Sequence, residues 1–445
     1  MIKRLAHVVL SGWWVTFGLC AQSPVSYQKE IEPVLKKQCL GCHMAQNKQG
    51  GLLLSSYSDF QKGGAKGPGF TNVVGYISGE RQPRMPFGGK SLPDETIATF
   101  RRWVAEGSKD DSASGPAEVS KSHQPALYTA PPLVMAIAFS PDGKLLAVAG
   151  YREILLHEYG GKLLARLPGI AMRIHSLAFS PDGKRLAAVG GDPAERGEMQ
   201  IWDVASRKQT ASIVTSNDTF FGVSFSPDGT KIAFAGADKS VRLYDAETGK
   251  EIRKMDHHEE WVFGTVFGID GKRLVSVSRD RAAKLTEVDT GRFIENVNLL
   301  REPLTAVTRH PKKDWIALGG AERIPYLYKL DRPRAMRIAD DSTLIRKFDK
   351  QDGPILALAI SPDGQLLAVG SEVGDVRIYN LETGELKGKC TGHVGGIYTL
   401  VFHPSSKELL TAGFDGMVRS YDVSGNLLKA FAPVPLEKTA VARND

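Results

Sequence analysis

Cysteine is scarce in this 445-residue chain, and its four cysteines, at positions 20, 39, 42 and 390, are placed too unevenly to form a disulfide framework. A run of about 20 apolar residues, which a membrane-spanning helix needs, is also missing. Neither charge sign dominates, because 57 basic residues face 50 acidic ones and no basic stripe forms. These absences exclude a polytopic membrane protein and argue against a nucleic-acid-binding surface.

The N-terminus has the pattern of an export signal. Lys3 and Arg4 precede a mainly apolar run of 12 residues at 8–19, and the small residue Ala21 follows. This pattern predicts a signal peptide over residues 1–23, an exported protein in the periplasm or cell envelope, and no membrane span in the mature chain. Lipidation at Cys20 and an uncleaved anchor stay open as alternatives, so a peripheral or lipid-anchored association with the membrane is also considered.

One short motif carries specific chemistry, the segment Cys39-Leu40-Gly41-Cys42-His43. Two thiols three positions apart, followed at once by an imidazole, form the pattern of covalent c-type haem attachment. Such a pattern bonds the porphyrin through Cys39 and Cys42 and places His43 beneath the iron as the proximal ligand. A redox-active thiol pair, half of a zinc site and a chance pentapeptide are the alternatives.

A second ligand candidate follows in a loop rich in glycine and proline. Met85 lies directly before Pro86, 42 residues after His43. A thioether opposite an imidazole is a common axial pair in haem proteins, so Met85 is predicted to be the distal ligand of the iron. The alternative is that Met85 only packs in a core.

The first hundred residues resemble the planctomycete-type cytochrome c family. The matching segments lie between positions 27 and 108: Ile31-Glu32-Pro33-Val34-Leu35, the thiol motif at 39–43, Gly50-Gly51-Leu52, Gly63-Gly64, Met85-Pro86 and Trp103-Val104-Ala105-Glu106-Gly107. Met44 and Phe87 depart from residues common in that family. The resemblance implies a small all-α class-I-type cytochrome c domain over residues 24–108, with one covalent haem c.

Residues 109–125 contain almost no large apolar side chain and are predicted to be a flexible linker. Beyond them, a Ser-Pro-Asp-Gly turn or a degenerate copy of it recurs seven times, at intervals of 40 to 51 residues. The copies start at positions 140, 180, 226, 268, 310, 361 and 403. A period near forty residues is typical of propeller blades, each of which has four short strands.

This array resembles the WD-repeat proteins, with Trp202-Asp203 as the one copy of the namesake dipeptide. The resemblance implies an all-β seven-bladed propeller over residues 126–435, followed by a tail at 436–445. The segment His257-His258-Glu259-Glu260-Trp261 could suggest a metal site, but the resemblance implies a histidine there that hydrogen-bonds within its blade. Acids at the repeat turns are likewise expected to accept hydrogen bonds, namely Asp238, Asp280, Asp375 and Asp415.

Together these features predict an exported mono-haem c-type cytochrome that transfers single electrons, with redox proteins as donor and acceptor. The propeller is expected to dock a protein partner, and nucleic acid is not expected as a partner. Two alternatives are a two-cofactor oxidoreductase with catalysis in the propeller and a haem-containing interaction scaffold. Enzyme activity stays open, although an electron-transfer haem protein is favoured over a catalyst.

Overall fold

The structure is a computed structural model that describes residues 23–44, 47–54, 57–67, 69–111, 127–332 and 340–436. The predicted signal peptide up to residue 22, most of the predicted linker, residues 333–339 in the longest interval between repeat turns and the tail after residue 436 lie outside these ranges. The chain divides into two compact units, Met1–Gly115 and Pro116–Asp445, and each is described by itself.

The N-terminal unit is built from short helices. They are η1 (Tyr27–Ile31), α1 (Glu32–Gln38), η2 (Gln49–Gly51), α2 (Tyr57–Lys62), α3 (Gly69–Ser78) and α4 (Asp94–Ala105). Helix α4 begins at Asp94, as expected from its acidic first turn, which suits the positive end of the helix dipole. Ile97, Phe100 and Trp103 form its buried face, which follows from their helical spacing.

The core of this unit is mainly aromatic. Trp103 lies within 6.4 Å, between ring centroids, of Tyr27, Tyr57, Phe60 and Phe70. The unit also contains a small antiparallel pair, β1 (His43–Met44) with β2 (Asn47–Lys48). The prediction of an all-α domain is therefore corrected, because backbone pairing begins at His43, directly after the second thiol.

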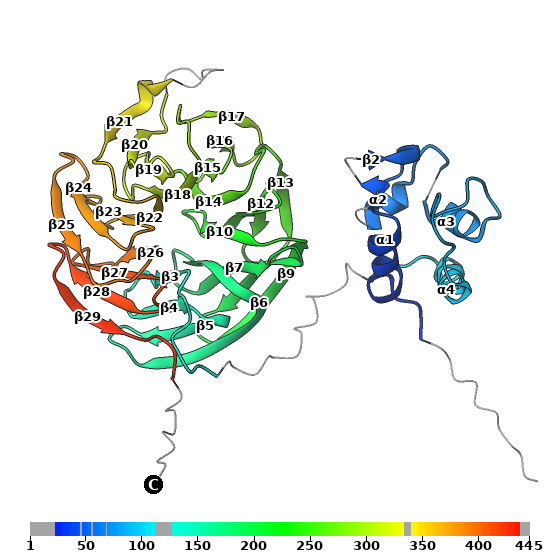
Figure 1. Cartoon of the computed structure of the whole chain (residues 1–445), viewed down its shortest axis with the longest axis horizontal. Coiled ribbons are helices and arrows are strands. Elements are labelled where there is room, and N and C mark those ends of the chain that lie inside the picture. The colour runs from blue at the N-terminus through cyan, green and yellow to red at the C-terminus, as the bar shows by residue number, and fades with distance from the viewer. Residues whose placement is uncertain are drawn as a thin grey trace, which may run out of the picture. The chain divides into compact units, whose positions relative to one another are not determined.

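The C-terminal unit is a propeller of antiparallel sheets arranged in a ring (Figure 1). Its first sheet has seven strands: β3 (Ile137–Phe139), β4 (Leu145–Ala149), β5 (Tyr151–Glu158), β6 (Leu163–Phe179), β7 (Arg185–Asp192), β8 (Arg196–Asp203) and β9 (Lys208–Ser216). Strand β6 has 17 residues and is at once the outer strand of the first blade and the inner strand of the second. Two blades are thus fused into one sheet.

Five four-stranded sheets complete the ring. The third and fourth blades contain β10 (Phe220–Phe225), β11 (Lys231–Gly236), β12 (Val241–Asp245), β13 (Glu251–Met255), β14 (Val262–Phe267), β15 (Arg273–Ser278), β16 (Ala283–Glu287) and β17 (Phe293–Asn296). The fifth contains β18 (Leu304–Arg309), β19 (Trp315–Gly320), β20 (Tyr326–Lys329) and β21 (Leu344–Lys347), with the short helix η3 (Asp341–Thr343) before β21.

The last two blades contain β22 (Ile355–Ile360), β23 (Leu366–Ser371), β24 (Val376–Asn380), β25 (Leu386–Cys390), β26 (Ile397–Phe402), β27 (Glu408–Gly413), β28 (Val418–Asp422) and β29 (Leu427–Phe431). Cys390 ends β25 and is buried. The second strand of each sheet is the most completely buried, because it has neighbours on both sides and on both faces.

The recurring turn joins the first strand of a blade to the second. In the first copy the Gly143 N–H donates to the Ser140 carbonyl over 2.9 Å. The Asp142 carboxylate accepts from the Ser140 hydroxyl at 2.6 Å and from the Lys144 N–H at 3.1 Å. Gly143 has a φ of +72°, which other residues rarely adopt. The sequence prediction of these turns is confirmed.

The ring closes where its two ends meet. Strand β29 supplies the last outer strand. Tyr128 forms a single parallel bridge with Leu436, so residues near the start of the propeller contact those near its end. The Ile137 N–H also donates to the Thr399 hydroxyl at 3.2 Å and joins the first blade to the seventh. Radial repetition of this kind leaves only short, protected sheet edges.

Candidate functional site

The cysteine motif lies at the end of α1, where the helix stops and the chain turns into β1. The Cys39 N–H donates to the Leu35 carbonyl at 2.9 Å, and the Cys42 N–H donates to the Cys39 carbonyl at 3.2 Å. Cys39 packs against the aromatic core, whereas Cys42 is exposed. Burial, together with the neighbouring Cys42, raises the pKa of the Cys39 thiol to about 11.

The two predicted axial ligands occupy different settings. His43 is buried, and its Nδ1 atom lies 3.4 Å from the Leu52 carbonyl oxygen. Met85 is partly buried against the same apolar cluster as Cys39, and its N–H donates to the Tyr76 carbonyl at 2.9 Å. The structure therefore brings Cys39 and Met85 to one core. Among the described residues, no group of three His, Cys, Asp or Glu side chains is arranged to hold a metal.

The propeller presents its connecting loops on two opposite faces. Because the strands of a blade are antiparallel, the Ser-Pro-Asp-Gly turns lie at one face and the links between blades at the other. The turns between second and third strands share that second face, which we call the loop face. Loops on a rigid ring are where binding residues are usually found.

One sector of the loop face carries an aromatic cluster that sequence analysis missed. The Phe221 ring lies 5.3 Å from Phe263 and 5.8 Å from Trp261. Arg279 stacks 5.5 Å above Trp261, which is 39% exposed. Phe221 and Phe263 stand five positions before their repeat turns, as does His175, so the repeat register contained the signal. The contact between Phe221 and Phe263, which lie on different blades, forms only in the folded propeller.

Beneath this cluster lies a buried hydrogen-bond group. His258 Nδ1 lies 2.8 Å from Asp280 Oδ2, and its Nε2 lies 2.7 Å from the Ser276 hydroxyl. These distances resemble those of a nucleophilic triad. Ser276 is only 4% exposed and His258 only 5%, so substrate has no access to the hydroxyl. The prediction that these groups bond within the blade is confirmed.

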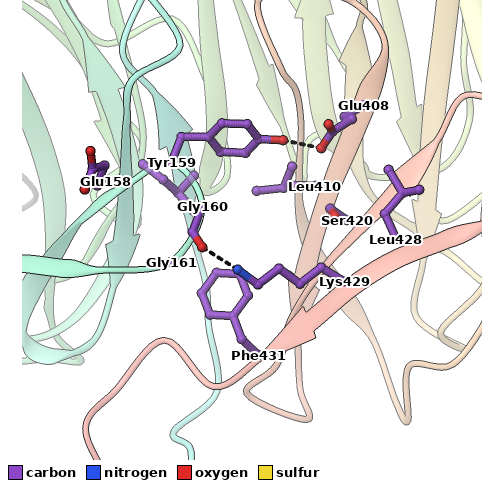
Figure 2. Close-up of a pocket in the computed structure, with 11 residues that line it drawn as sticks. Glu158, Tyr159, Gly160, Gly161, Glu408, Leu410, Ser420, Leu428, Lys429 and Phe431 are labelled. Carbon is purple, nitrogen blue, oxygen red and sulfur yellow. Dashed lines mark hydrogen bonds between the residues drawn. The ribbon is translucent and has the colours of Figure 1, made fainter.

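A small pocket lies where the first and last blades meet (Figure 2). Tyr159, Gly160, Glu408, Lys429 and Phe431 line it, and its volume is about 260 Å³. The Tyr159 hydroxyl donates to the Glu408 carboxylate, and the Lys429 ammonium donates to the Gly160 carbonyl. These polar groups form hydrogen bonds with one another between the first and last blades. The volume of the pocket is below that usual for ligand pockets. The pocket therefore belongs to the closure of the ring.

Two families of repeat domains match parts of the propeller. The WD domain, G-beta repeat, matches residues 161–203 and 207–245. The Anaphase-promoting complex subunit 4 WD40 domain matches residues 307–403. The chain thus contains WD40 repeats within a propeller, as the turn pattern predicted.

Similar proteins are also WD-repeat proteins, and each match is partial. "Uncharacterized WD repeat-containing protein C9G1.05" of Schizosaccharomyces pombe is 31% identical over 27% of this chain and 19% of its own length. "Periodic tryptophan protein 2" of Arabidopsis thaliana is 27% identical over 29% of this chain and 13% of its own length. "WD repeat-containing protein 1" of Mus musculus is 36% identical over 17% of this chain and 13% of its own length. The matched segments span less than a fifth of these relatives.

These findings correct the predicted function. WD-repeat relatives point to a protein-interaction scaffold and not to a haem cytochrome, so the predictions of one-electron transfer and of a covalent haem c were wrong. Redox proteins as donor and acceptor find no support either. WD-repeat propellers typically bind proteins, and no helix among the described residues is long and apolar enough to cross a bilayer. The family matches fall between residues 161 and 403, so the individual roles of Cys39, Cys42, His43 and Met85 stay untested predictions.

Proposed function

We propose that this protein is an interaction scaffold whose propeller binds a protein partner on its loop face, with Trp261 at the centre of the contact. The observation that carries the proposal is the exposed stack of Arg279 on Trp261, supported from below by Phe221. Trp and Arg are the residues that most often dominate the binding energy of protein interfaces.

The surroundings of Trp261 favour binding over mere packing. Arg279, Arg281 and Lys239 are exposed on neighbouring turns, and none of them forms an ion pair with another described residue. The rigid group of His258 and Asp280 holds the loop that bears Trp261, because the Asp280 carboxylate also accepts the Glu259 N–H at 3.0 Å. A preorganised aromatic anchor loses little entropy when a partner binds.

The test compares two exposed aromatic residues. Trp261→Ala removes the proposed anchor, whereas Phe293→Ala alters an equally exposed ring, also 39% accessible, on the outer strand β17. Proteins cross-linked to each variant in its native host would be quantified by mass spectrometry. We expect a partner that is retained by Phe293→Ala and lost, by at least about tenfold, with Trp261→Ala. Equal recovery with both variants would contradict the proposal.

We further propose that residues 24–108 and 126–435 are separate domains joined by the linker at 109–125, and that the protein is exported to the periplasm or cell envelope. The composition of residues 1–23 and 109–125 supports both proposals. Limited proteolysis should cut first between 109 and 125. Mass spectrometry of the mature N-terminus should show that processing removes the first 23 residues, and an intact Met1 would contradict export by cleavage.

A further inference from the structure

The inner strands of the seven blades surround a central channel with a volume of about 540 Å³. This lies within the range of small-molecule sites. Apolar residues such as Phe179, Val223 and Leu358 contribute to its lining, but polar groups make up the larger part of the exposed wall. Among the described residues that line it, Arg309 has the one charged side chain. None of these described residues is an Asp, Glu or Lys.

Arg309 stands at a position where every other repeat has an apolar residue. Directly before the seven turns come Phe139, Phe179, Phe225, Phe267, Arg309, Ile360 and Phe402. The inner strand β18 ends at Arg309 in the same way that β10 ends at Phe225 and β22 at Ile360. The guanidinium therefore occupies the place of an aromatic or aliphatic side chain.

This cation has no counter-charge in the described part of the chain. The guanidinium of Arg309 forms no ion pair and no hydrogen bond there, in contrast to Arg273 nearby in the ring, which pairs with Asp314. Burial lowers the pKa of Arg309, although arginine remains charged in proteins. An unpaired, half-buried charge is unfavourable, and an anion beside it would relieve that cost.

Hydroxyl groups in the same channel add further donors. Ser176 accepts the Val223 N–H at 3.3 Å, and Thr399 accepts the Ile137 N–H at 3.2 Å. Each hydroxyl then still has its own hydrogen to donate. His175 and Tyr398 are the other titratable side chains among the described residues of the lining. Burial and the nearby Arg173 lower the pKa of His175 to about 4, so this ring is neutral at pH 7 and adds no negative charge.

We propose that the central channel binds a small oxyanion, such as phosphate or a short dicarboxylate, through the guanidinium of Arg309. A planar guanidinium makes paired hydrogen bonds with two oxygens of such a group. No acidic side chain is among the described residues that line the channel, so no negative charge in the lining offsets the attraction of Arg309 for an anion. This site does not depend on the proposed partner surface at Trp261, which lies on the loop face.

The experiment is a calorimetric titration of the full chain with inorganic phosphate, and in parallel with malonate, at pH 7 and constant ionic strength set with potassium chloride. We expect one saturable site per chain for at least one of the two probes. Arg309→Phe, which introduces the residue of the neighbouring repeats, should weaken binding by about tenfold or more. Arg301→Gln removes an exposed cation that does not line the channel and should leave the affinity unchanged.

Arg309→Gln provides a second variant if the larger ring disturbs the blade, and circular dichroism checks that each variant is folded. Tighter binding of phosphate than of malonate, or the reverse, identifies the preferred oxyanion. Unchanged affinity in both Arg309 variants would overturn the proposal, as would the lack of saturable binding of either probe to the unaltered protein. Loss of partner binding in Trp261→Ala would leave this result unaffected, so the two proposals fail separately.

Discussion

His258 and Asp280 lie 2.8 Å apart and join a link between blades to a turn within the fourth blade. His393 and Asp415 repeat this arrangement in the seventh blade, at 3.1 Å. In both places the second ring nitrogen reaches a hydroxyl of the second strand, Ser276 or Thr411. The same three groups thus fasten the loop face at two separate points of the ring, and this gives the proposed partner surface a rigid support.

Removal of the fourth-blade histidine should destabilise the propeller. His258→Ala leaves the Asp280 carboxylate, which is 9% exposed, without its closest partner. The carboxylate keeps the Lys284 ammonium at 3.6 Å and the Glu259 N–H, so the cost is that of a lost buried hydrogen bond, and we expect a loss of about 1–3 kcal/mol in the free energy of unfolding. His257→Ala is the control, because that half-buried ring bonds only the Gly291 carbonyl, and its loss should be less than about 1 kcal/mol. Urea unfolding measures both, and equal losses would contradict this role for Asp280.

Acid should weaken the propeller through His175. Burial and then Arg173 lower the pKa of His175 in the folded chain to about 4, below its ordinary value of 6.5. The neutral ring therefore stabilises the fold fully above pH 6.5, and this contribution is lost as the pH falls from 6.5 to 4. His175→Phe should reduce the loss in that window by roughly 1–2 kcal/mol, allowing for partial solvent screening.

Urea midpoints at pH 7.5 and 4.5 test this expectation. Arg173→Gln is the matched variant, because it removes only the smaller of the two causes and should reduce the acid sensitivity less than His175→Phe does. If His175→Phe shows the same pH dependence as the unaltered protein, the acid sensitivity arises elsewhere in the ring.

The three described cysteines should differ in reactivity. The thiolate is the reactive form, and burial raises the pKa of Cys39 to about 11 and that of Cys390 to about 12. Cys42 is exposed. At pH 8 we expect iodoacetamide to modify Cys42 first, then Cys39, with Cys390 modified last. Peptide mapping by mass spectrometry gives the order, and urea-unfolded protein should react without this selectivity. Faster modification of Cys39 than of Cys42 would be inconsistent with the structure.

The repeat turns were readable from sequence because their structure is local. Ser140, Asp142 and Gly143 bond one another within five residues, so the motif alone specifies the turn. The continuous strand β6 was not predicted, since Pro168 and Gly169 resemble a break and only pairing on both sides keeps the strand extended. The cluster of Phe221, Trp261 and Phe263 was not predicted either, because its rings come from different blades and meet only in the folded ring.

The thiol motif shows the opposite error, in which a short motif received too much weight. From the five residues Cys39 to His43 we predicted a cofactor and a function for the whole chain, although most of the chain forms the propeller. Residue spacing describes which groups are near one another along the chain. It does not describe what the rest of the protein does with them, and here the repeats determine the proposed function.

The buried ion pair near the ring closure provides the last test. The Glu153 carboxylate is 1% exposed and accepts from Arg166 Nε at 2.7 Å and Nη2 at 2.6 Å, and from the Tyr128 hydroxyl at 2.7 Å. Tyr128 also bridges to Leu436, so this group lies where the first described residues of the propeller meet the last. Arg166→Gln leaves a buried carboxylate without its cation and should cost about 3 kcal/mol of unfolding free energy.

Tyr128→Phe removes the hydrogen bond to Glu153 and the one that the hydroxyl accepts from the Tyr151 N–H at 3.1 Å, but it keeps the ion pair, so its expected cost is about 2 kcal/mol. Arg152→Gln, which alters a neighbouring arginine that stacks 5.6 Å from the Tyr151 ring, serves as the control and should cost less than either. Because Glu153 joins Arg166 and Tyr128, the double variant should deviate from the sum of the two single losses. Strict additivity in urea unfolding would mean that the two contacts with Glu153 act independently, and that the ring is not closed through this group.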